Sequence, residues 1–169
     1  FLGYVHFGKD MRNVVLSAQG LDILNMPAII FRTRQMPQEI ADALISIRVS
    51  LQRANSTDVV VKCAQVCELI LGRKIESELK ADLSRKEAYE EKETRPPSKL
   101  PLGEMISLLC RWRVLREDTV AYSAVSAVNQ YRRKVHIEAK ENARVSEITP
   151  EDAYICNTLL EIFLRLWFA

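Results

Sequence analysis

The sequence feature that most constrains the fold is a pair of similar segments, residues 113–125 and residues 148–160. Each segment opens with polar and acidic residues, as the start of a helix does, and continues as a stripe of apolar residues. When Ser123 is aligned with Asn157, the two segments are offset by 34 residues. An offset in this range is typical of helix–turn–helix repeats. The pair therefore predicts an all-α fold of stacked antiparallel helical hairpins, a short α-solenoid.

The composition agrees with an ordered helical protein. The 169 residues can bury a core as one domain or a short array, 48% of them are hydrophobic, and only 5 are glycine. No run of about 18 uncharged apolar residues occurs, so we expect no membrane-spanning helix. The formal charge of +2 neither requires nor excludes RNA as a partner. Arginines, which suit bidentate contacts with phosphate, supply 15 of the 24 basic residues.

Apolar periodicity and proline positions divide the chain into four parts. We expect an N-terminal arm and short helix over 1–36, a helical hairpin with a charged helical extension over 37–95, a linker over 96–100, and helical repeats over 101–169. The residues expected to face the core of the hairpin are Ile40, Leu44, Ile47 and Leu51 on its first helix and Val60, Cys63, Cys67 and Ile70 on its second. In the charged extension we expect ion pairs such as Glu76–Lys80.

Three helices are expected in the last part of the chain. The second of them begins near Val120, and it either ends near Arg132 or continues as one long helix, because no glycine or proline interrupts it. The third begins at Thr149, with Thr149 as the N-cap and Pro150 and Asp152 in the first turn. Its expected core-facing residues are Ile155, Leu159, Ile162, Phe163 and Leu166.

Residues 120–125 and 154–160 resemble the helix opening of pentatricopeptide repeats, with an aromatic residue, a small polar residue and an apolar pair. The resemblance covers roughly residues 103–167, and residues 100–115 are also similar to the helical repeats of organellar proteins with a RAP domain. Such relatives are arrays of helical hairpins that work on organellar RNA. The base-reading position of the family falls on Ala124, which cannot hydrogen-bond a base edge, and on Thr158, which can.

Two groups of basic residues are candidates for contact with RNA. One follows the first helix of the last part, and the other follows residue 131. Together with the position implied by the resemblance, the predicted RNA-binding residues are Arg111, Arg113, Arg116, Arg132, Arg133, Lys134 and Thr158. Guanidinium groups in such clusters contact the phosphates of folded RNA without reading sequence. Ordinary surface charges or intramolecular ion pairs are the alternative.

The sequence contains no pattern that indicates catalysis. The two histidines, His6 and His136, belong to no triad or metal motif, and no glycine-rich phosphate loop occurs. The four cysteines are expected to be buried and reduced rather than to bind metal: Cys63, Cys67, Cys110 and Cys156. We therefore expect no enzyme activity, no cofactor and no metal.

The resemblance and the small number of repeats imply a non-catalytic, RNA-associated structural subunit of an organellar ribonucleoprotein, in particular the mitochondrial ribosome, located in the mitochondrial matrix. Its expected partners are the other protein subunits of a large assembly and rRNA phosphates. Two alternatives remain open. One is a protein-only accessory scaffold subunit of a mitochondrial respiratory or ATP synthase complex, and the other is a cytosolic helical-repeat adaptor.

Overall fold

The computed structural model describes residues 3–4, 15–16, 37–140 and 148–168, with side chains described for 37–135 and 148–168. The elements in this part of the chain are β1 (Gly3–Tyr4), β2 (Val15–Leu16), α2 (Gln38–Gln52), α3 (Ser56–Ala81), α4 (Leu83–Glu90), the 3-10 helix η3 (Pro97–Lys99), α5 (Leu102–Arg111), α6 (Val120–Lys140) and α7 (Pro150–Trp167). The two strands form one short antiparallel pair, with Gly3 opposite Leu16. The predicted all-α class is confirmed. The arm and short helix predicted for 1–36 otherwise lie outside the described residues.

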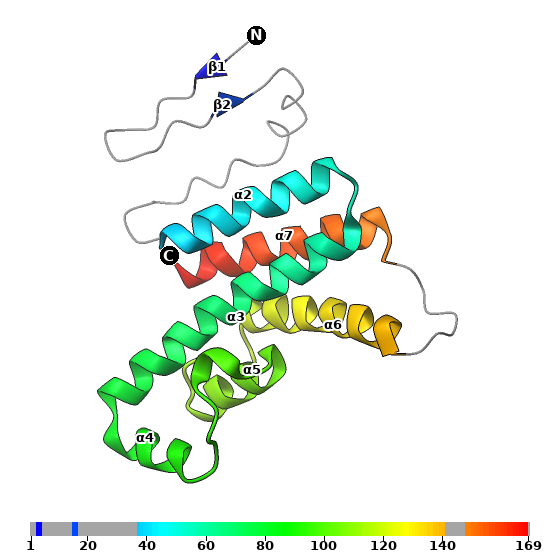
Figure 1. The fold of residues 1–169 in the computed structure, drawn as a ribbon. Helices are drawn as coiled ribbons and strands as arrows, with labels where there is room; N and C mark the ends of the chain where they lie inside the picture. Colours follow the sequence, from blue (N-terminus) through cyan, green and yellow to red (C-terminus); the bar gives the residue numbers. More distant parts are fainter. Residues whose placement is uncertain (1–2, 5–14, 17–36, 141–147, 169) are drawn as a thin grey trace.

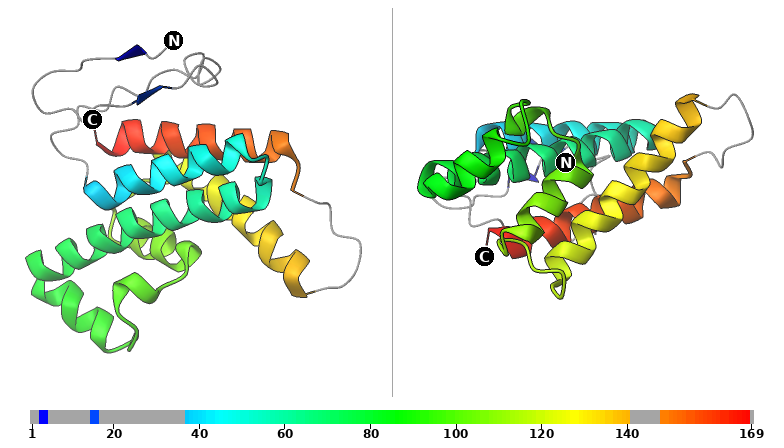
Figure 2. Two further views of the ribbon diagram at one scale, coloured as in Figure 1. Left: turned by 45° about the horizontal axis from the view of Figure 1, so that its top comes forward. Right: turned by 90° about the horizontal axis from the view of Figure 1, so that it is seen from below.

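Helix α3 is the centre of the arrangement (Figure 1). It contacts α2, α4, η3, α5, α6 and α7, and α7 packs in addition against α6 and α2. Figure 2 shows α6 crossing α7 on one side of this assembly. In an α-solenoid each hairpin contacts only its sequence neighbours. The all-α prediction therefore holds, but the predicted solenoid stacking is not confirmed.

The α2–α3 hairpin forms as the sequence predicts. Pro37 precedes the first turn of α2, and the side chain of Asn55 caps α3 by accepting a hydrogen bond from the Asp58 backbone N–H at 3.1 Å. Between the helices, Ala54 takes a left-handed conformation with φ of 52°, which reverses the chain. The predicted stripes meet in the core, where Ile40 and Ile47 of α2 are buried.

A polar network crosses this hairpin near its turn. The buried Ser50 hydroxyl has two acceptors within reach of its one proton, the Ser46 carbonyl at 3.0 Å and the Asp58 carboxylate. Lys62 donates to the Ser50 hydroxyl at 2.8 Å and pairs with Asp58 at 2.6 Å. Hydrogen bonds from Lys62 and Ser50 hold the pKa of Asp58 below its ordinary value. The one polar side chain of α2 that faces the core is therefore fully partnered.

The charged extension is helical but is not one continuous helix. Helix α3 ends at Ala81, and the Asp82 side chain caps α4 by accepting from the Arg85 backbone N–H at 3.2 Å. Because of this break, the predicted helical periodicity of apolar residues does not continue past Ala81, and Leu83 is 68% exposed. The ion pairs also differ from the predicted Glu76–Lys80 pair, since Glu78 is the residue that pairs with Lys74 and Arg85.

Two predictions concern α7: the position of its N-terminal cap, which is confirmed, and its core-facing stripe, which is wrong in part. Thr149 and Asp152 form a capping box at the start of α7, as predicted. The predicted core-facing stripe of α7 is wrong in part, because Ile155 and Leu166 are each 49% exposed. The residues that α7 buries are Ala153, Cys156, Asn157, Leu160, Glu161, Phe163 and Leu164. An apolar helix surface extends around most of α7, so periodicity alone cannot identify the face that packs.

The open question about α6 is also answered, because α6 continues through Arg132 to Lys140 as one helix. The buried residues of all these helices form one core that extends from Ile40 to Leu164. The predicted linker 96–100 contains η3, which packs against α3 and joins the two halves of the chain at that core. Among the described helices, none combines the length and the hydropathy that a bilayer-spanning segment requires.

Candidate functional site

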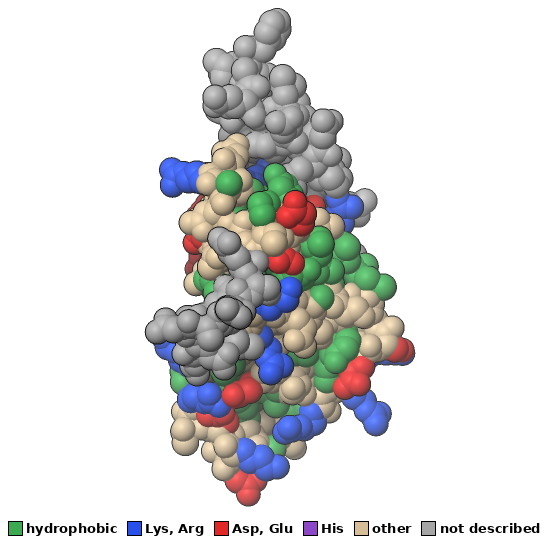
Figure 3. Space-filling model, turned by 90° about the vertical axis from the view of Figure 1, so that its right-hand side faces the viewer, with side chains coloured by type: hydrophobic (Ala, Val, Ile, Leu, Met, Phe, Trp, Pro, Cys, Tyr) green, Lys and Arg blue, Asp and Glu red, His purple; other side chains and the backbone are tan. Residues whose placement is uncertain are grey.

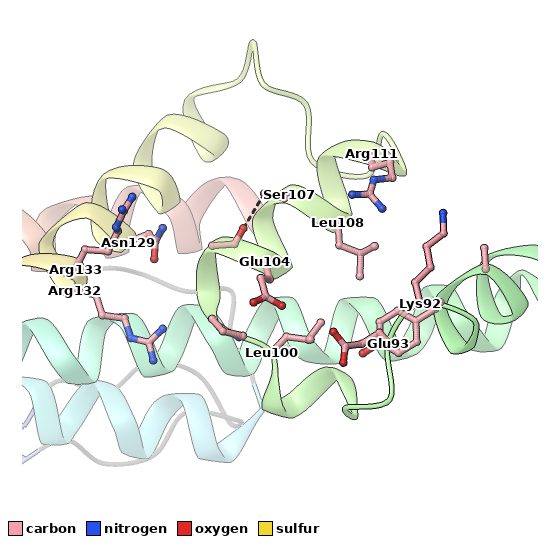
Figure 4. A pocket seen from close by; sticks show the side chains of 14 residues that line it. Lys92, Glu93, Leu100, Glu104, Ser107, Leu108, Arg111, Asn129, Arg132 and Arg133 are labelled. Carbon is pink, nitrogen blue, oxygen red and sulfur yellow. Dashed lines mark hydrogen bonds between the residues drawn. The ribbon is translucent and has the colours of Figure 1, made fainter. Parts of the chain in front are cut away.

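A groove of about 880 Å³ lies where the end of α4 and the turn after it meet α5 and α6 (Figure 4). Its walls combine apolar, acidic and basic side chains. The residues that line it are Ala88, Tyr89, Lys92, Glu93, Leu100, Pro101, Gly103, Glu104, Ser107, Leu108, Arg111, Asn129, Arg132 and Arg133. We refer to this site as the basic groove.

Helical geometry explains how α5 and α6 contribute side chains to the basic groove. Residues one helical turn apart lie on one face, and Glu104 and Arg111 on α5 are separated by two such turns. On α6, Asn129, Arg132 and Arg133 follow the same spacing. Gly103 lets the two helices approach closely, because a Cβ atom at that position would lie 3.2 Å from the Asn129 side-chain nitrogen. The local sequence thus supplies two faces that converge.

Three of the predicted RNA-binding residues meet in the basic groove: Arg111, Arg132 and Arg133. Arg132 and Arg133 lie at one end, and Arg111 and Lys92 lie at the other (Figure 4). Lys92 was not predicted, because it stands among acidic residues in the sequence and only the fold brings it near Arg111. Because Lys92 lies inside the charged extension expected over 37–95, the local sequence carried no signal that it would line a groove with Arg111.

The cations of the basic groove differ in their partners. Arg132 on α6 pairs with Glu68 on α3 at 2.5 Å, and this ion pair is partly buried. Within the described part of the chain, Lys92, Arg111 and Arg133 have no ion pair. An excess of unpaired positive charge in a concave site favours an anionic ligand.

The acidic residues of the basic groove, Glu93 and Glu104, both form ion pairs with Arg95. One Arg95 nitrogen, Nη2, lies 2.6 Å from a carboxylate oxygen of Glu93 and 2.6 Å from a carboxylate oxygen of Glu104. Hydrogen bonds from the Arg95 side chain and backbone lower the pKa of Glu93 to about 2. Both carboxylates are therefore engaged by a cation that the chain itself supplies.

The other predicted site residues lie elsewhere. Arg116 pairs with Asp118 at 2.6 Å, and Arg113 is exposed in the turn after α5, with a φ of 58°. Lys134 lies 3.7 Å from Asp152, and its Nζ atom is 4.9 Å from the centre of the Tyr131 ring. The two predicted basic groups are therefore divided between the basic groove, the α5–α6 turn and the contact between α6 and α7.

The two positions implied by the family resemblance differ in exposure. Thr158 is exposed on α7, where its hydroxyl donates to the Tyr154 carbonyl at 2.9 Å. Ala124 is 2% exposed. Trp112 is half-buried against the core, with the Arg85 guanidinium 5.6 Å from its ring centre, so it is packed within the protein.

Neither histidine contributes a described side chain to any site, since His6 lies outside the described residues and only the backbone of His136 is described. Where the structure describes side chains, no group of three or more His, Cys, Asp or Glu residues is placed to hold a metal ion. The four cysteines are free, and burial raises the pKa of the Cys67 thiol. The absence of enzyme activity remains a prediction.

Charges on other parts of the surface are mixed. On the face shown in Figure 3, basic and acidic side chains are interspersed, with apolar side chains between them.

The chain matches no family model, no curated protein sequence and no solved structure. Within the described part of the chain, the basic groove is where unpaired cations from several elements lie together.

Proposed function

We propose that this chain is a non-catalytic, RNA-associated structural subunit of an organellar ribonucleoprotein, in particular the mitochondrial ribosome of the matrix. The observation that carries the proposal is the convergence of Lys92, Arg111 and Arg133 on one groove, from three elements, without ion pairs to described residues. An external polyanion is the partner that suits these cations.

The groove favours contact with the RNA backbone rather than base reading. Arginine contacts phosphate through its planar, bidentate donor set, and such contacts position a protein without specifying sequence. The groove offers Asn129 and Ser107 as polar groups, but the Ser107 hydroxyl donates to the Gly103 carbonyl at 2.9 Å. The helix faces that surround the groove provide the surface for neighbouring protein subunits in this proposal.

The test compares two triple variants with the same loss of charge. Lys92→Gln, Arg111→Gln and Arg133→Gln remove the unpaired cations of the groove, and Arg53→Gln, Lys80→Gln and Arg165→Gln remove exposed cations elsewhere. In-cell ultraviolet crosslinking of tagged full-length protein, followed by sequencing of the attached RNA, should give organellar rRNA for the wild type. For purified protein, the logarithm of the RNA-binding constant should fall linearly with the logarithm of the salt concentration. The groove variant should reduce the magnitude of this slope by about 2, because each of the three lost phosphate contacts with a single strand accounts for roughly 0.7.

Three results would count against this proposal. Equal loss of rRNA crosslinks in both triple variants would mean that net charge, not the groove, sets retention. Crosslinks scattered over many mRNAs would indicate an RNA-processing factor. An absence of crosslinked RNA in a protein that still sediments in a large complex would contradict RNA contact.

A second candidate function is a protein-only accessory scaffold, for example in a mitochondrial respiratory or ATP synthase complex. The observation that favours it is the exposure of large apolar side chains on two neighbouring helices, with Ile45 of α2 61% exposed and Ile155 and Leu166 of α7 each 49% exposed. Exposed apolar groups of this size suit protein contacts. Replacing Ile155 and Leu166 with Glu should release the chain from a protein complex under this alternative and leave RNA crosslinks unchanged.

A further inference from the structure

We propose that Arg95 makes the basic groove selective for anions, by holding the two carboxylates that face the groove, Glu93 and Glu104. This inference rests on the proposed function, since it concerns the ligand of the same groove. It assigns a specificity-determining role to a residue that does not line the groove itself. The contacts of Arg95, its position and its backbone anchoring each support this role.

The contacts show that Arg95 engages both carboxylates at once. Its Nη2 atom donates to Glu93 and to Glu104 at 2.6 Å each, and its Nε atom donates to Glu93 at 2.9 Å. The Arg95 backbone N–H donates to the same Glu93 carboxylate at 2.9 Å. Glu93 belongs to the turn after α4 and Glu104 to α5, so one guanidinium joins two walls of the groove.

The position of Arg95 keeps its charge away from the ligand side. Glu93 and Glu104 line the basic groove, whereas Arg95 lines a second hollow of about 660 Å³ formed by the end of α3, α4 and the turn before η3. Glu93 lines both hollows and so forms part of the wall between them. The guanidinium thus draws the carboxylates from behind this wall, and the unpaired cations of the groove face the ligand.

The backbone around Arg95 is fixed by its neighbours. The hydroxyl of Tyr89, a residue only 8% exposed, donates to the Arg95 carbonyl at 2.7 Å. Pro96 follows directly, with a φ of −64° that its ring imposes. A side chain on a backbone held from both sides loses less conformational freedom when it forms two ion pairs. The backbone of the turn therefore holds Arg95 in the position where it pairs with both Glu93 and Glu104.

Removal of Arg95 should change the groove by more than one charge. Loss of the guanidinium leaves Glu93 and Glu104 without their cationic partner, and both can then repel a phosphate or pair with Lys92 or Arg111 in the same groove. An ordinary surface cation lacks this second effect. An anionic ligand can therefore bind beside the groove carboxylates only while Arg95 is paired with them.

The experiment measures binding of full-length protein to fluorescent poly(U) by anisotropy at low salt. Arg95→Gln should weaken binding about tenfold, whereas the control Lys99→Gln, which removes an exposed cation from neighbouring η3, should weaken it about twofold. Adding Glu93→Gln and Glu104→Gln to the Arg95 variant should restore binding to the level of the Lys99 control. In the wild-type background, the same two glutamate substitutions should have a smaller effect.

A second readout does not depend on RNA. The pKa of Glu93, followed by NMR, should rise from about 2 toward the ordinary glutamate value in the Arg95→Gln protein. If that protein does not fold, Arg95→Lys keeps the charge but not the fork of donors, and it should weaken binding about threefold.

The outcomes separate this inference from the proposed function. Equal weakening by Arg95→Gln and Lys99→Gln, or no rescue by the glutamate substitutions, would overturn the role of Arg95 while groove binding stands. Failure of the wild type to bind poly(U) at low salt, with Glu93 still titrating near pH 2, would overturn the proposed groove function although the Arg95 contacts exist.

Discussion

The two ends of α3 differ in what stabilises them. The apolar end, residues 56–75, contains ten buried residues: Val59, Val60, Cys63, Ala64, Val66, Cys67, Ile70, Leu71, Gly72 and Ile75. The charged end, which we define as residues 76–90 and which includes α4, buries only Tyr89. Apart from Tyr89 and the partly buried Leu79, its contacts are chiefly ion pairs, such as those of Glu78 with Lys74 and Arg85.

This difference separates stability from binding within one stretch of chain. Burying a large apolar side chain contributes about 1.5–3 kcal/mol, whereas an exposed ion pair contributes about 0–1 kcal/mol. The apolar end therefore holds the fold together. The charged end contributes little stability, and its last turn and the residues after it form one wall of the basic groove.

The largest contrast should come from truncating the same residue type at both ends. Leu71→Ala, at a fully buried position, should lower the free energy of unfolding by about 2–5 kcal/mol, since it removes core contacts and leaves a cavity. Leu83→Ala, at a position 68% exposed, should change it by less than about 0.5 kcal/mol. Urea unfolding followed by circular dichroism measures both. Similar losses for the two variants would show that the charged end contributes more to the core than its exposure indicates.

Removing the helix caps at the two ends should produce a smaller difference in stability than truncating the two leucines. Asn55→Ala removes the cap of α3 and should cost about 1 kcal/mol in the same urea experiment, because the apolar end unfolds only with the whole core. Asp82→Ala removes the cap of α4 and should mainly speed hydrogen exchange of the α4 amides. A shift of the urea midpoint by Asp82→Ala as large as that by Asn55→Ala would contradict this division.

The ion pairs of the charged end should make a small contribution that depends on pH. A hydrogen bond from Lys74 and the charges of Lys74 and Arg85 lower the pKa of Glu78 in the folded protein. Its contribution is therefore present above the pKa of Glu in the unfolded chain and is lost as the pH falls through the folded pKa. Glu78→Gln should reduce the free energy of unfolding by less than about 1 kcal/mol at neutral pH and by nothing in strong acid. An equal deficit at both pH values would contradict the ion-pair explanation.

The smallest predicted effect is that of Glu161, whose contribution to stability should depend on pH in the opposite direction to that of Glu78. Glu161 of α7 is buried beside the core, where desolvation raises its pKa, although hydrogen bonding from Asn157 at 3.1 Å partly opposes this. The folded state therefore holds this proton more tightly, and stability decreases as the pH rises from the unfolded to the folded pKa. Glu161→Gln keeps an acceptor for Asn157 and should leave stability at neutral pH unchanged or slightly higher. Urea midpoints across the acidic range, compared with wild type, measure the loss of this pH dependence.

Much of the fold could be predicted where local signals agree with the packing. The stripes of α2 and α3 contain Ile40, Ile47, Cys63 and Cys67, all of which are buried, and the Thr149 cap starts α7 where expected. In α2 and α3 the predicted apolar stripe coincides with the buried face, so helical periodicity identifies both the helix and its buried side there. The exposed Leu83 shows the limit, because one capping aspartate ended the helix and changed the direction of the stripe.

The two similar segments that predicted repeats are not equivalent in their burial. Ser123 is exposed, whereas the aligned Asn157 is 4% exposed and donates to Glu161. The next pair shows the reverse, with Ala124 buried and Thr158 exposed. Both segments start helices, but they present different faces to the core. The resemblance to pentatricopeptide repeats therefore stays a prediction about sequence pattern.

The candidate site could be predicted only in part. The sequence indicated Arg111, Arg132 and Arg133 as basic residues, but not that they line one groove with Lys92. Which cations remain unpaired depends on partners far away in the chain, such as Glu68 for Arg132. The role proposed for Arg95 likewise depends on a contact with α5 that no local pattern reports.

The central position of α3 has a consequence for how the molecule opens. Because α2, α5, α6 and α7 all pack on α3, no pair of these helices can separate and leave the others with a complete core. A linear repeat array, by contrast, can lose its end units one at a time. The amide protons of the apolar end should therefore exchange with solvent only when the whole domain unfolds, in a single cooperative step.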